Sequence, residues 1–346
     1  NYRKITSEEP KKIPIADLKG KVSEDVLKGL TAFWSKDSVK PGLMEFQRDA
    51  IDKILADKHT IISSPTGTGK TEAFIIPIIE KILNPSGRIP IDKKQFREST
   101  HVLLVYPRTA LVDDQATRIN YILDDCNLSD KITVGRLHSG IQGEYRDKLR
   151  ESRPKIFACT FPFINYHLRT KSKIWEELIQ PAKMLVMDES HSYTSYEGSN
   201  VHHLLKRMKK PDPKGNQMEL QYIASSATLH NPKEFFKTMF DLQEEDPERI
   251  RLIQNEERRK RNLHEFFIMP LTVNQITTMT KFVTEIASRK AKGADRTHQM
   301  IAFSDSLDNA EILAGNVRSD SNGKVKIEAH HSAIRNRRDI EQFFKN

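Results

Sequence analysis

Cysteine is scarce in this sequence, and its two cysteines lie far apart along the chain. Cys126 and Cys159 belong to no Cys-x-x-Cys pair and have no repeated histidine spacing beside them. A disulfide framework, a four-cysteine zinc site and a four-cysteine iron–sulfur cluster are therefore excluded within this chain.

Long hydrophobic runs are also lacking. The most apolar stretch, residues 74–83, contains Pro77, Glu80 and Lys81 and is too short to cross a hydrocarbon core of about 30 Å. The N-terminal residues contain no apolar segment like that of a secretory signal. We therefore expect no membrane partner and an intracellular location, in the cytoplasm or nucleus, or in the nucleoid if the source is prokaryotic.

Acidic residues are fewer than basic ones. The chain has 47 Asp and Glu against 56 Lys and Arg, which gives a net charge of +9 and a pI near 9.3. This balance favours a polyanionic partner such as nucleic acid, although net charge also serves solubility. Hydrophobic residues make up 37% of the chain and charged residues 30%, as in ordinary folded proteins.

From residue 45 onward, apolar segments of strand length alternate with segments of helical periodicity. Strands are predicted at residues 60–62, 101–106, 131–134, 155–159, 183–188 and 221–225. After a highly charged stretch the alternation restarts, with strands predicted at 266–269, 299–304 and 324–328 and helices near 273–290 and from 307. This pattern is typical of parallel sheets covered by helices and predicts an α/β fold.

The length of 346 residues and the interruption of the pattern suggest two domains. We expect an N-terminal accessory segment at 1–40, a first domain at 41–245, a linker at 246–262 and the start of a second domain at 263–346. The last segment is about half as long as such a domain requires, so we expect the second domain to be incomplete in this chain.

A glycine-rich segment, Ser63-Ser-Pro-Thr-Gly-Thr-Gly-Lys-Thr71, follows a predicted strand and precedes a predicted helix. This is the context of a phosphate-binding loop, and ATP is the predicted ligand. The glycines allow successive backbone N–H groups to face phosphates, and Lys70 supplies positive charge to the β- and γ-phosphates. The hydroxyl of Thr71 is suited to hold Mg²⁺.

The loop departs from the G-x-x-x-x-G-K-[ST] pattern at one position, where Ser64 replaces the first glycine. The predicted ATP-binding residues of the loop are Thr66, Gly67, Thr68, Gly69, Lys70 and Thr71.

Two adjacent carboxylates end the predicted strand at 183–188, in the segment Met184-Leu-Val-Met-Asp-Glu-Ser-His191. Ligand sites of α/β sheets form at the carboxyl ends of strands. We predict that Asp188 holds Mg²⁺ through water and that Glu189 polarises the water that attacks the γ-phosphate.

Together with Ser225-Ser-Ala-Thr228, these segments resemble motifs I, II and III of the superfamily 2 helicases in order and spacing. Gln47 occupies the place of the family's adenine-reading glutamine. Tyr106-Pro-Arg-Thr-Ala-Leu-Val-Asp-Asp-Gln115, Cys159-Thr-Phe-Pro162 and Ile301-Ala-Phe-Ser304 look like motifs Ia, Ib and IV, so the resemblance covers residues 45–344. The Asp-Glu-x-His box followed by Tyr193 and Gly198-Ser-Asn-Val201 looks most like the Lhr-like and RecQ-associated DNA helicases.

The resemblance implies tandem RecA-like P-loop domains and a role for each matching residue. The implied catalytic residues are Lys70, Asp188, Glu189 and His191, with Thr71 and Asp188 holding the metal. The implied contacts to the nucleic-acid backbone are Arg108, Thr109, Gly140, Thr160 and Ser304. The residues implied to couple the nucleotide state to the nucleic-acid contacts are Ser225, Ala227 and Thr228.

The implied activity is ATP-driven movement along one strand of single-stranded or forked DNA, with ATP and Mg²⁺ as cofactors. An RNA helicase, a nucleotide-gated nucleic-acid-binding module and the motor subunit of a nuclease or restriction system stay open as alternatives. The family's motifs V and VI, the latter rich in arginine, would follow residue 346. We therefore expect this segment alone to bind ATP and to hydrolyse it slowly, because such arginines stabilise transition-state charge.

Overall fold

The structure, a computed structural model, describes residues 2–6, 12–35, 42–84, 102–140, 143–211, 215, 218–227, 229–242, 247–256, 262–266, 274–288, 302–304, 306–322 and 325–329. The chain divides into two compact units. The larger spans residues 5–262, and the smaller comprises residues 1–4 and 263–346.

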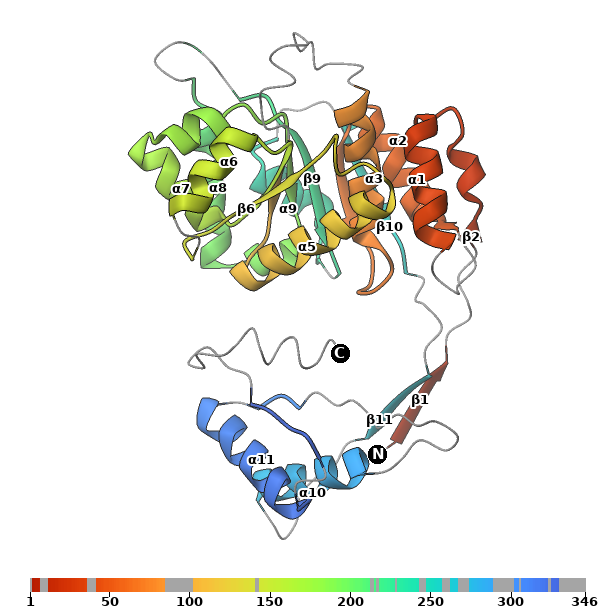
Figure 1. Ribbon diagram of the computed structural model, residues 1–346, viewed down its shortest axis with the longest axis vertical. Helices are drawn as coiled ribbons and strands as arrows, with labels where there is room; N and C mark the ends of the chain where they lie inside the picture. The colour runs from red at the N-terminus through yellow and green to blue at the C-terminus, as the bar shows by residue number, and fades with distance from the viewer. Residues whose placement is uncertain are drawn as a thin grey trace. The chain divides into compact units, whose positions relative to one another are not determined.

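The larger unit is built on a parallel sheet of seven strands in the order β10-β4-β9-β8-β5-β7-β6. Figure 1 labels β6, β9 and β10 of this sheet, with helices around it. The strands are β4 (His59–Ser63), β5 (Val102–Val105), β6 (Val134–Leu137), β7 (Ile156–Cys159), β8 (Met184–Met187), β9 (Gln221–Ser226) and β10 (Ile250–Gln254). Every residue of β5, β7 and β8 is buried, as expected for parallel strands covered on both faces. The predicted α/β class is thus confirmed.

Helices cover the two faces of this sheet. Side chains of α2 (Glu45–Leu55), α3 (Lys70–Leu83) and α5 (Thr109–Asp125) form one core cluster with alternate residues of the strands. Side chains of α7 (Phe161–Thr170), α8 (Tyr196–Met208) and α9 (Pro232–Met239) form the second core cluster with the remaining strand residues, which point to the opposite face of the sheet. Leu149 of α6 (Gly143–Ser152) and the π-helical turn Trp175–Ile179 also belong to this cluster. Short 3-10 helices lie in the connections of this unit: η3 (Ser190–Tyr193) between β8 and α8, and η4 (Pro247–Arg249) directly before β10.

Residues 12–35, within the expected accessory segment, pack into the core of the larger unit. They form β2 (Lys12–Ile13), which pairs with β3 (Leu43–Met44), the 3-10 helix η1 (Ile15–Leu18) and α1 (Glu24–Ser35). Helix α1 approaches the end of α5 so closely that a Cβ added at Gly29 would lie 2.7 Å from Cβ of Cys126. Glycine is therefore required at this crossing.

Strand β10 lies within residues 246–262, the segment predicted as a linker, and pairs in parallel with β4. Its one charged residue, Arg251, and the charged segments on either side hide it in the sequence, because an edge strand tolerates a charged side chain that a central strand excludes. The predicted strand at 131–134 is displaced, since the structure places β6 at Val134–Leu137.

The smaller unit contains α10 (Gln275–Ser288) and α11 (Leu307–Asp320), which pack through Val283, Leu313 and Val317. Strand β1 (Tyr2–Thr6) pairs with β11 (Asn262–Phe266). Residues 302–304 and 325–328, parts of two predicted strands, are not in strands. A β-strand requires a hydrogen-bonded neighbour, which apolar composition alone does not provide.

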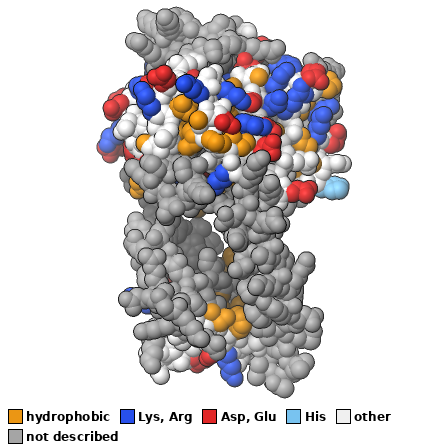
Figure 2. Space-filling view, turned by 90° about the vertical axis from the view of Figure 1, so that its right-hand side faces the viewer, with side chains coloured by type: hydrophobic (Ala, Val, Ile, Leu, Met, Phe, Trp, Pro, Cys, Tyr) orange, Lys and Arg blue, Asp and Glu red, His pale blue; other side chains and the backbone are white. Residues whose placement is uncertain are grey.

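The described helices include none that is both long enough and apolar enough to cross a membrane. On the face drawn in Figure 2, Lys and Arg side chains are interspersed with Asp and Glu over the described surface of the larger unit.

Candidate nucleotide and nucleic-acid site

The order of the strands brings the predicted motifs to one edge of the sheet. Because all strands are parallel, their carboxyl ends share an edge. Strands β4, β9 and β8 are neighbours, so the glycine-rich loop after β4, the end of β9 and the acidic residues after β8 lie next to one another. We call the ends of β4, β9 and β8 the nucleotide half of the edge.

The glycine-rich loop depends on two glycines in the left-handed region of the backbone. Gly67 has a φ of 75° and Gly69 a φ of 93°. A Cβ at Gly69 would lie 2.4 Å from Nε2 of Gln47, because Gln47 donates a hydrogen bond of 2.8 Å to the Gly69 carbonyl. The Oε1 atom of Gln47 accepts a hydrogen bond from the backbone of Met44. Gln47 is therefore fixed against the loop by both ends of its amide.

Ser64, the departure from the glycine pattern, has no left-handed φ and is buried. Its hydroxyl lies 2.6 Å from that of Thr68 and accepts a hydrogen bond of 2.9 Å from Nδ2 of Asn255. Glycine is therefore not required here, and serine links the loop to the end of β10. Sequence reasoning missed Asn255, which follows a strand that was not predicted.

Lys70 begins α3, and its Nζ donates to the carbonyl oxygens of Ser64 and Pro65 at 3.0 and 3.3 Å. The lysine thus lies across the loop. Thr71 is buried in the first turn of α3, whereas Thr66 and Gly67 are exposed at the tip of the loop.

The acidic pair lies directly after β8. Asp188 is 7% exposed, and its burial, with a further contribution from the charge of Glu189, raises its pKa to about 6. The Ser225 side chain, the Glu189 amide and Lys70 act in the opposite direction. Glu189 has a left-handed φ of 49°, and its amide donates to Oδ1 of Asp188. Such a conformation is unfavourable for a residue with a Cβ, and the hydrogen bond from its amide to Asp188 holds Glu189 in it.

His191 joins the acidic pair to β9. Its Nδ1 lies 3.4 Å from Oε2 of Glu189 and 3.3 Å from the hydroxyl of Ser226. The Ser226 carbonyl accepts a hydrogen bond from the Ser64 amide, so a continuous path runs from Glu189 to the glycine-rich loop. Sequence reasoning did not select Ser226, although the residue lies in the Ser-Ser-Ala-Thr segment that it singled out.

The other predicted coupling residues lie close to this path. The hydroxyl of Ser190 donates to the carbonyl of Ser225, which fixes the turn after β8 to β9. Ala227 is half-buried at the end of β9. Thr228 lies outside the described residues.

The donor set suits Mg²⁺ bound together with a nucleotide. Proteins hold Mg²⁺ with one or two carboxylates and leave the remaining positions to substrate phosphates and water. The buried Asp188 carboxylate and the Thr71 hydroxyl are the groups that would hold the ion here. No group of three His, Cys, Asp or Glu side chains able to hold a metal occurs in the described part of the chain.

Strands β5, β7 and β6 are consecutive in the sheet, and their carboxyl ends form the nucleic-acid half of the edge. Arg108 and Thr109, both exposed, begin α5 after β5, and Thr160 begins α7 after β7. Gly140, also exposed, follows β6. The first turn of α5 has backbone N–H groups without a partner inside the helix, which favour phosphate, and α7 has one fewer because its second residue is Pro162.

Two predicted contacts differ from the others. Thr160 is only 7% exposed, so its side chain presents little surface at this edge. Ser304 is exposed and belongs to the smaller unit.

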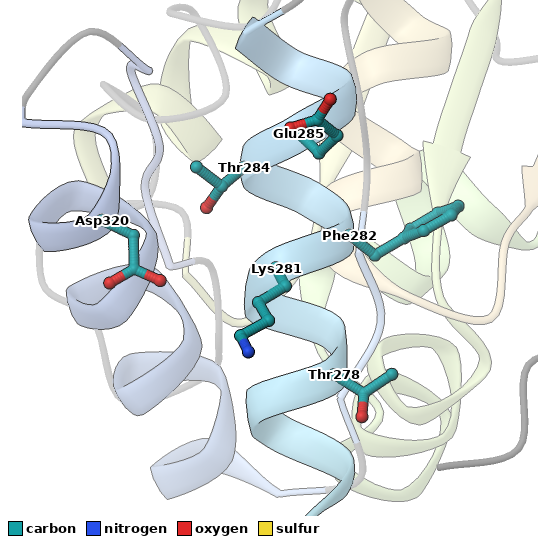
Figure 3. Close-up of a pocket in the computed structure, with 6 residues that line it drawn as sticks. All are labelled: Thr278, Lys281, Phe282, Thr284, Glu285 and Asp320. Atoms are coloured by element: carbon teal, nitrogen blue, oxygen red, sulfur yellow. The ribbon is translucent and has the colours of Figure 1, made fainter. Parts of the chain in front are cut away.

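The smaller unit has a pocket of its own, which none of the predicted site residues lines. Figure 3 shows its side chains, which come from α10 and, in one case, from α11: Thr278, Lys281, Phe282, Thr284, Glu285 and Asp320. One lysine and two separate carboxylates on helix surfaces suggest no particular ligand.

A parallel sheet with a glycine-rich loop after one strand and an Asp-Glu pair after a strand two places away defines a P-loop nucleotide-binding domain. Residues 44–235 match the DEAD/DEAH box helicase family. Since the match covers more than half of the chain, the chain belongs to this family, which confirms the resemblance to superfamily 2 helicases.

Several ATP-dependent helicases are similar in sequence. One from Methanocaldococcus jannaschii is 28% identical over 246 residues, which are 69% of this chain and 34% of that protein. YprA of Bacillus subtilis is 23% identical over 92% of this chain and 39% of its own length. Hrq1 of Schizosaccharomyces pombe is 26% identical over 56% of this chain and 17% of its own length. The chain thus spans little more than a third of these relatives at most.

Two solved structures share the fold. The DUF1998 helicase MrfA bound to DNA and AMPPNP matches with a TM-score of 0.76 and 22% identity, over 99% of this chain and 44% of that one. Lhr of Mycobacterium smegmatis bound to single-stranded DNA and AMP-PNP matches with a TM-score of 0.68 and 18% identity, over 95% of this chain and 40% of that one.

Proposed function

We propose that this chain is the nucleotide-binding part of an ATP-driven helicase or translocase that acts on single-stranded or forked DNA. One observation carries the proposal: the nucleotide half and the nucleic-acid half share one edge of one sheet, where β8 and β5 are hydrogen-bonded neighbours. A displacement of Glu189 during the ATP cycle would therefore be transmitted through the paired strands β8, β5 and β7 to the starts of α5 and α7. An intracellular site of action, where ATP and nucleic acid occur together, is part of the same proposal.

The nucleotide half is assigned ATP binding and hydrolysis. The loop amides and Lys70 bind the phosphates, which replace the carbonyl contacts that Lys70 makes with Ser64 and Pro65. Thr71 and Asp188 hold Mg²⁺, which neutralises charge on the phosphates. Glu189 orients the attacking water, and His191 holds Glu189 toward Ser226.

The nucleic-acid half is assigned the sugar–phosphate backbone of one strand. Arg108 offers a charge, and the starts of α5 and α7 offer backbone N–H groups, none of which distinguishes one base from another. A motor that moves along a strand needs contacts of this kind because they repeat with every nucleotide.

The choice of DNA over RNA rests on two of the similar structures, whereas another structure that shares the fold, Mss116p, is bound to single-stranded RNA. The MrfA and Lhr structures that share this fold are bound to DNA. YprA and Hrq1 are named ATP-dependent helicases.

The test measures ATP analogue binding and ATP turnover by the purified protein and its Glu189→Gln variant. Each is assayed alone and with single-stranded DNA, duplex DNA or single-stranded RNA. Turnover stimulated by single-stranded DNA and lost in the variant, with analogue binding retained, supports the proposal. Equal turnover in the variant contradicts the role of Glu189, and stimulation by RNA alone contradicts the choice of DNA.

A further inference from the structure

A histidine links helix α5 to the turn that follows β6. Nε2 of His138 lies 3.2 Å from Oδ1 of Asp113, which is one helical turn beyond Thr109 at the start of α5. On the other side of the ring, Nδ1 accepts a hydrogen bond of 3.2 Å from the backbone N–H of Gly140. His138 is 5% exposed. Its buried ring therefore connects α5 to the turn after β6 beneath the surface of the nucleic-acid half.

The two contacts define the tautomer of the neutral ring. Since Nδ1 accepts a hydrogen from the Gly140 amide, it carries no hydrogen itself, and the neutral ring has its hydrogen on Nε2. Nε2 therefore donates to the Asp113 carboxylate. This carboxylate also lies 3.6 Å from NH1 of Arg136, a residue of β6 that precedes His138 by two positions. Two side chains from the end of β6 thus converge on one carboxylate of α5.

The turn is shaped to fit the ring. A Cβ added at Gly140 would lie 3.3 Å from both Cε1 and Nδ1 of His138, closer than such atoms usually approach. Glycine allows the backbone to lie against the imidazole while its other side stays exposed at the edge. Arg108 follows β5 and Gly140 follows β6, and strand β7 separates these two strands in the sheet. The contact between His138 and Asp113 therefore joins the turn that contains Gly140 directly to the helix that begins after Arg108.

We propose that His138 and Asp113 are positioning residues for nucleic-acid binding. They hold the turn at 138–140 against α5, so that Gly140 and the start of α5 present one surface to the sugar–phosphate backbone. The inference rests on the proposed function, because it takes Arg108 and Gly140 as contacts to nucleic acid. The contacts described for His138 and Asp113 all lie within the nucleic-acid half, so ATP affinity should not depend on them.

Three substitutions at His138 separate its two hydrogen bonds. His138→Ala removes both, His138→Asn keeps an amide oxygen near the position of Nδ1 to accept from Gly140, and His138→Gln keeps an amide donor near the position of Nε2 for Asp113. His203→Asn, which changes an exposed histidine on α8, is the matched control. Arg108→Ala tests the proposed contact itself.

The measurements are the affinity for a labelled single-stranded DNA oligonucleotide over a range of salt concentrations and the affinity for a fluorescent ATP analogue. His138→Ala is expected to weaken DNA binding about threefold to tenfold, a range typical of losing hydrogen bonds that order a binding surface, and His138→Asn to restore more of the affinity than His138→Gln. ATP analogue affinity should stay the same in all three. The salt dependence of DNA binding should also stay the same, because no charged contact to phosphate is lost.

Two results would overturn the positioning role while leaving the proposed function intact. One is DNA binding by His138→Ala at the wild-type affinity while Arg108→Ala still weakens it. The other is an equal loss of DNA and ATP analogue affinity in His138→Ala, which indicates a general structural role. Failure of the wild-type protein to bind DNA would instead overturn the proposed function together with the inference.

Discussion

The nucleotide half and the nucleic-acid half of the sheet edge differ in the burial and hydrogen bonding of the residues assigned to each site. In the nucleotide half, buried polar side chains bond to one another and to the loop, as Gln47, Ser64 and Lys70 do. In the nucleic-acid half, Arg108, Thr109 and Gly140 are exposed. A preformed polar network suits one small ligand of fixed shape, whereas exposed helix starts suit a polymer that binds in many registers.

The largest effect is expected in the nucleotide half. Lys70→Ala should weaken binding of a fluorescent ATP analogue on the order of 100-fold, because a charged hydrogen-bond donor to phosphate is lost. Binding of single-stranded DNA without nucleotide should change little. Lys28→Ala, at an exposed lysine of α1, is the control. Parallel loss of both affinities would show that the halves are not separate.

A structural substitution beside the acidic pair should come next. A Cβ at Gly198 would lie 2.1 Å from the carbonyl oxygen of Tyr193, so Gly198→Ala should force α8 away from the turn after Asp188 and Glu189. We expect the free energy of unfolding to fall by about 2–4 kcal/mol, measured by urea denaturation.

Gly143→Ala is the matched control for this change. A Cβ at Gly143, the first residue of α6, would meet nothing within 4 Å. Stability should stay equal or rise slightly. A urea midpoint of unfolding for Gly198→Ala equal to that of the wild-type protein would contradict the predicted clash.

Arg108→Ala should have an intermediate effect, confined to the nucleic-acid half. Single-stranded DNA affinity should fall about tenfold, and the slope of log affinity against log salt should become shallower by about 0.7, the value for one phosphate contact. ATP analogue affinity should be retained. An unchanged salt slope would remove Arg108 from the contact surface.

The smallest effect concerns the link between β10 and the loop. Asn255→Ala removes the hydrogen bond to the Ser64 hydroxyl and should weaken ATP analogue binding about threefold, as expected for one neutral hydrogen bond. Ser64→Gly, which restores the common P-loop residue, removes the same bond from the other side. If Asn255 acts through Ser64, combining the two substitutions should add little to either alone.

Much of the fold could be predicted from the sequence because the signals are local. Strands β4, β5, β7, β8 and β9 lie within two residues of their predicted bounds, since each is a short buried run between helical segments. Strand β10 was missed because Arg251 and the charged segments beside the strand suit an edge, and β6 was displaced because Ile132 is buried in the irregular segment before the strand. Apolar composition does not distinguish such a segment from a strand.

The candidate site was predictable only where function depends on consecutive residues. The glycines and Lys70 of the loop, and Asp188 with Glu189, occur at spacings that phosphate and metal chemistry require. Asn255 and the His138–Asp113 pair had no comparable signal, because each acts through a partner distant in the chain. No short pattern encodes such a contact.

By itself, the sequence determined the α/β alternation, the glycine-rich loop and the acidic pair, because backbone freedom and side-chain chemistry are properties of neighbouring residues. Only the tertiary structure decided that β9 lies between β4 and β8, and that Ser226 therefore connects Ser64 to His191. Strand order also separates the nucleotide half from the nucleic-acid half. It follows from which buried faces pack together, and that choice depends on the whole chain at once.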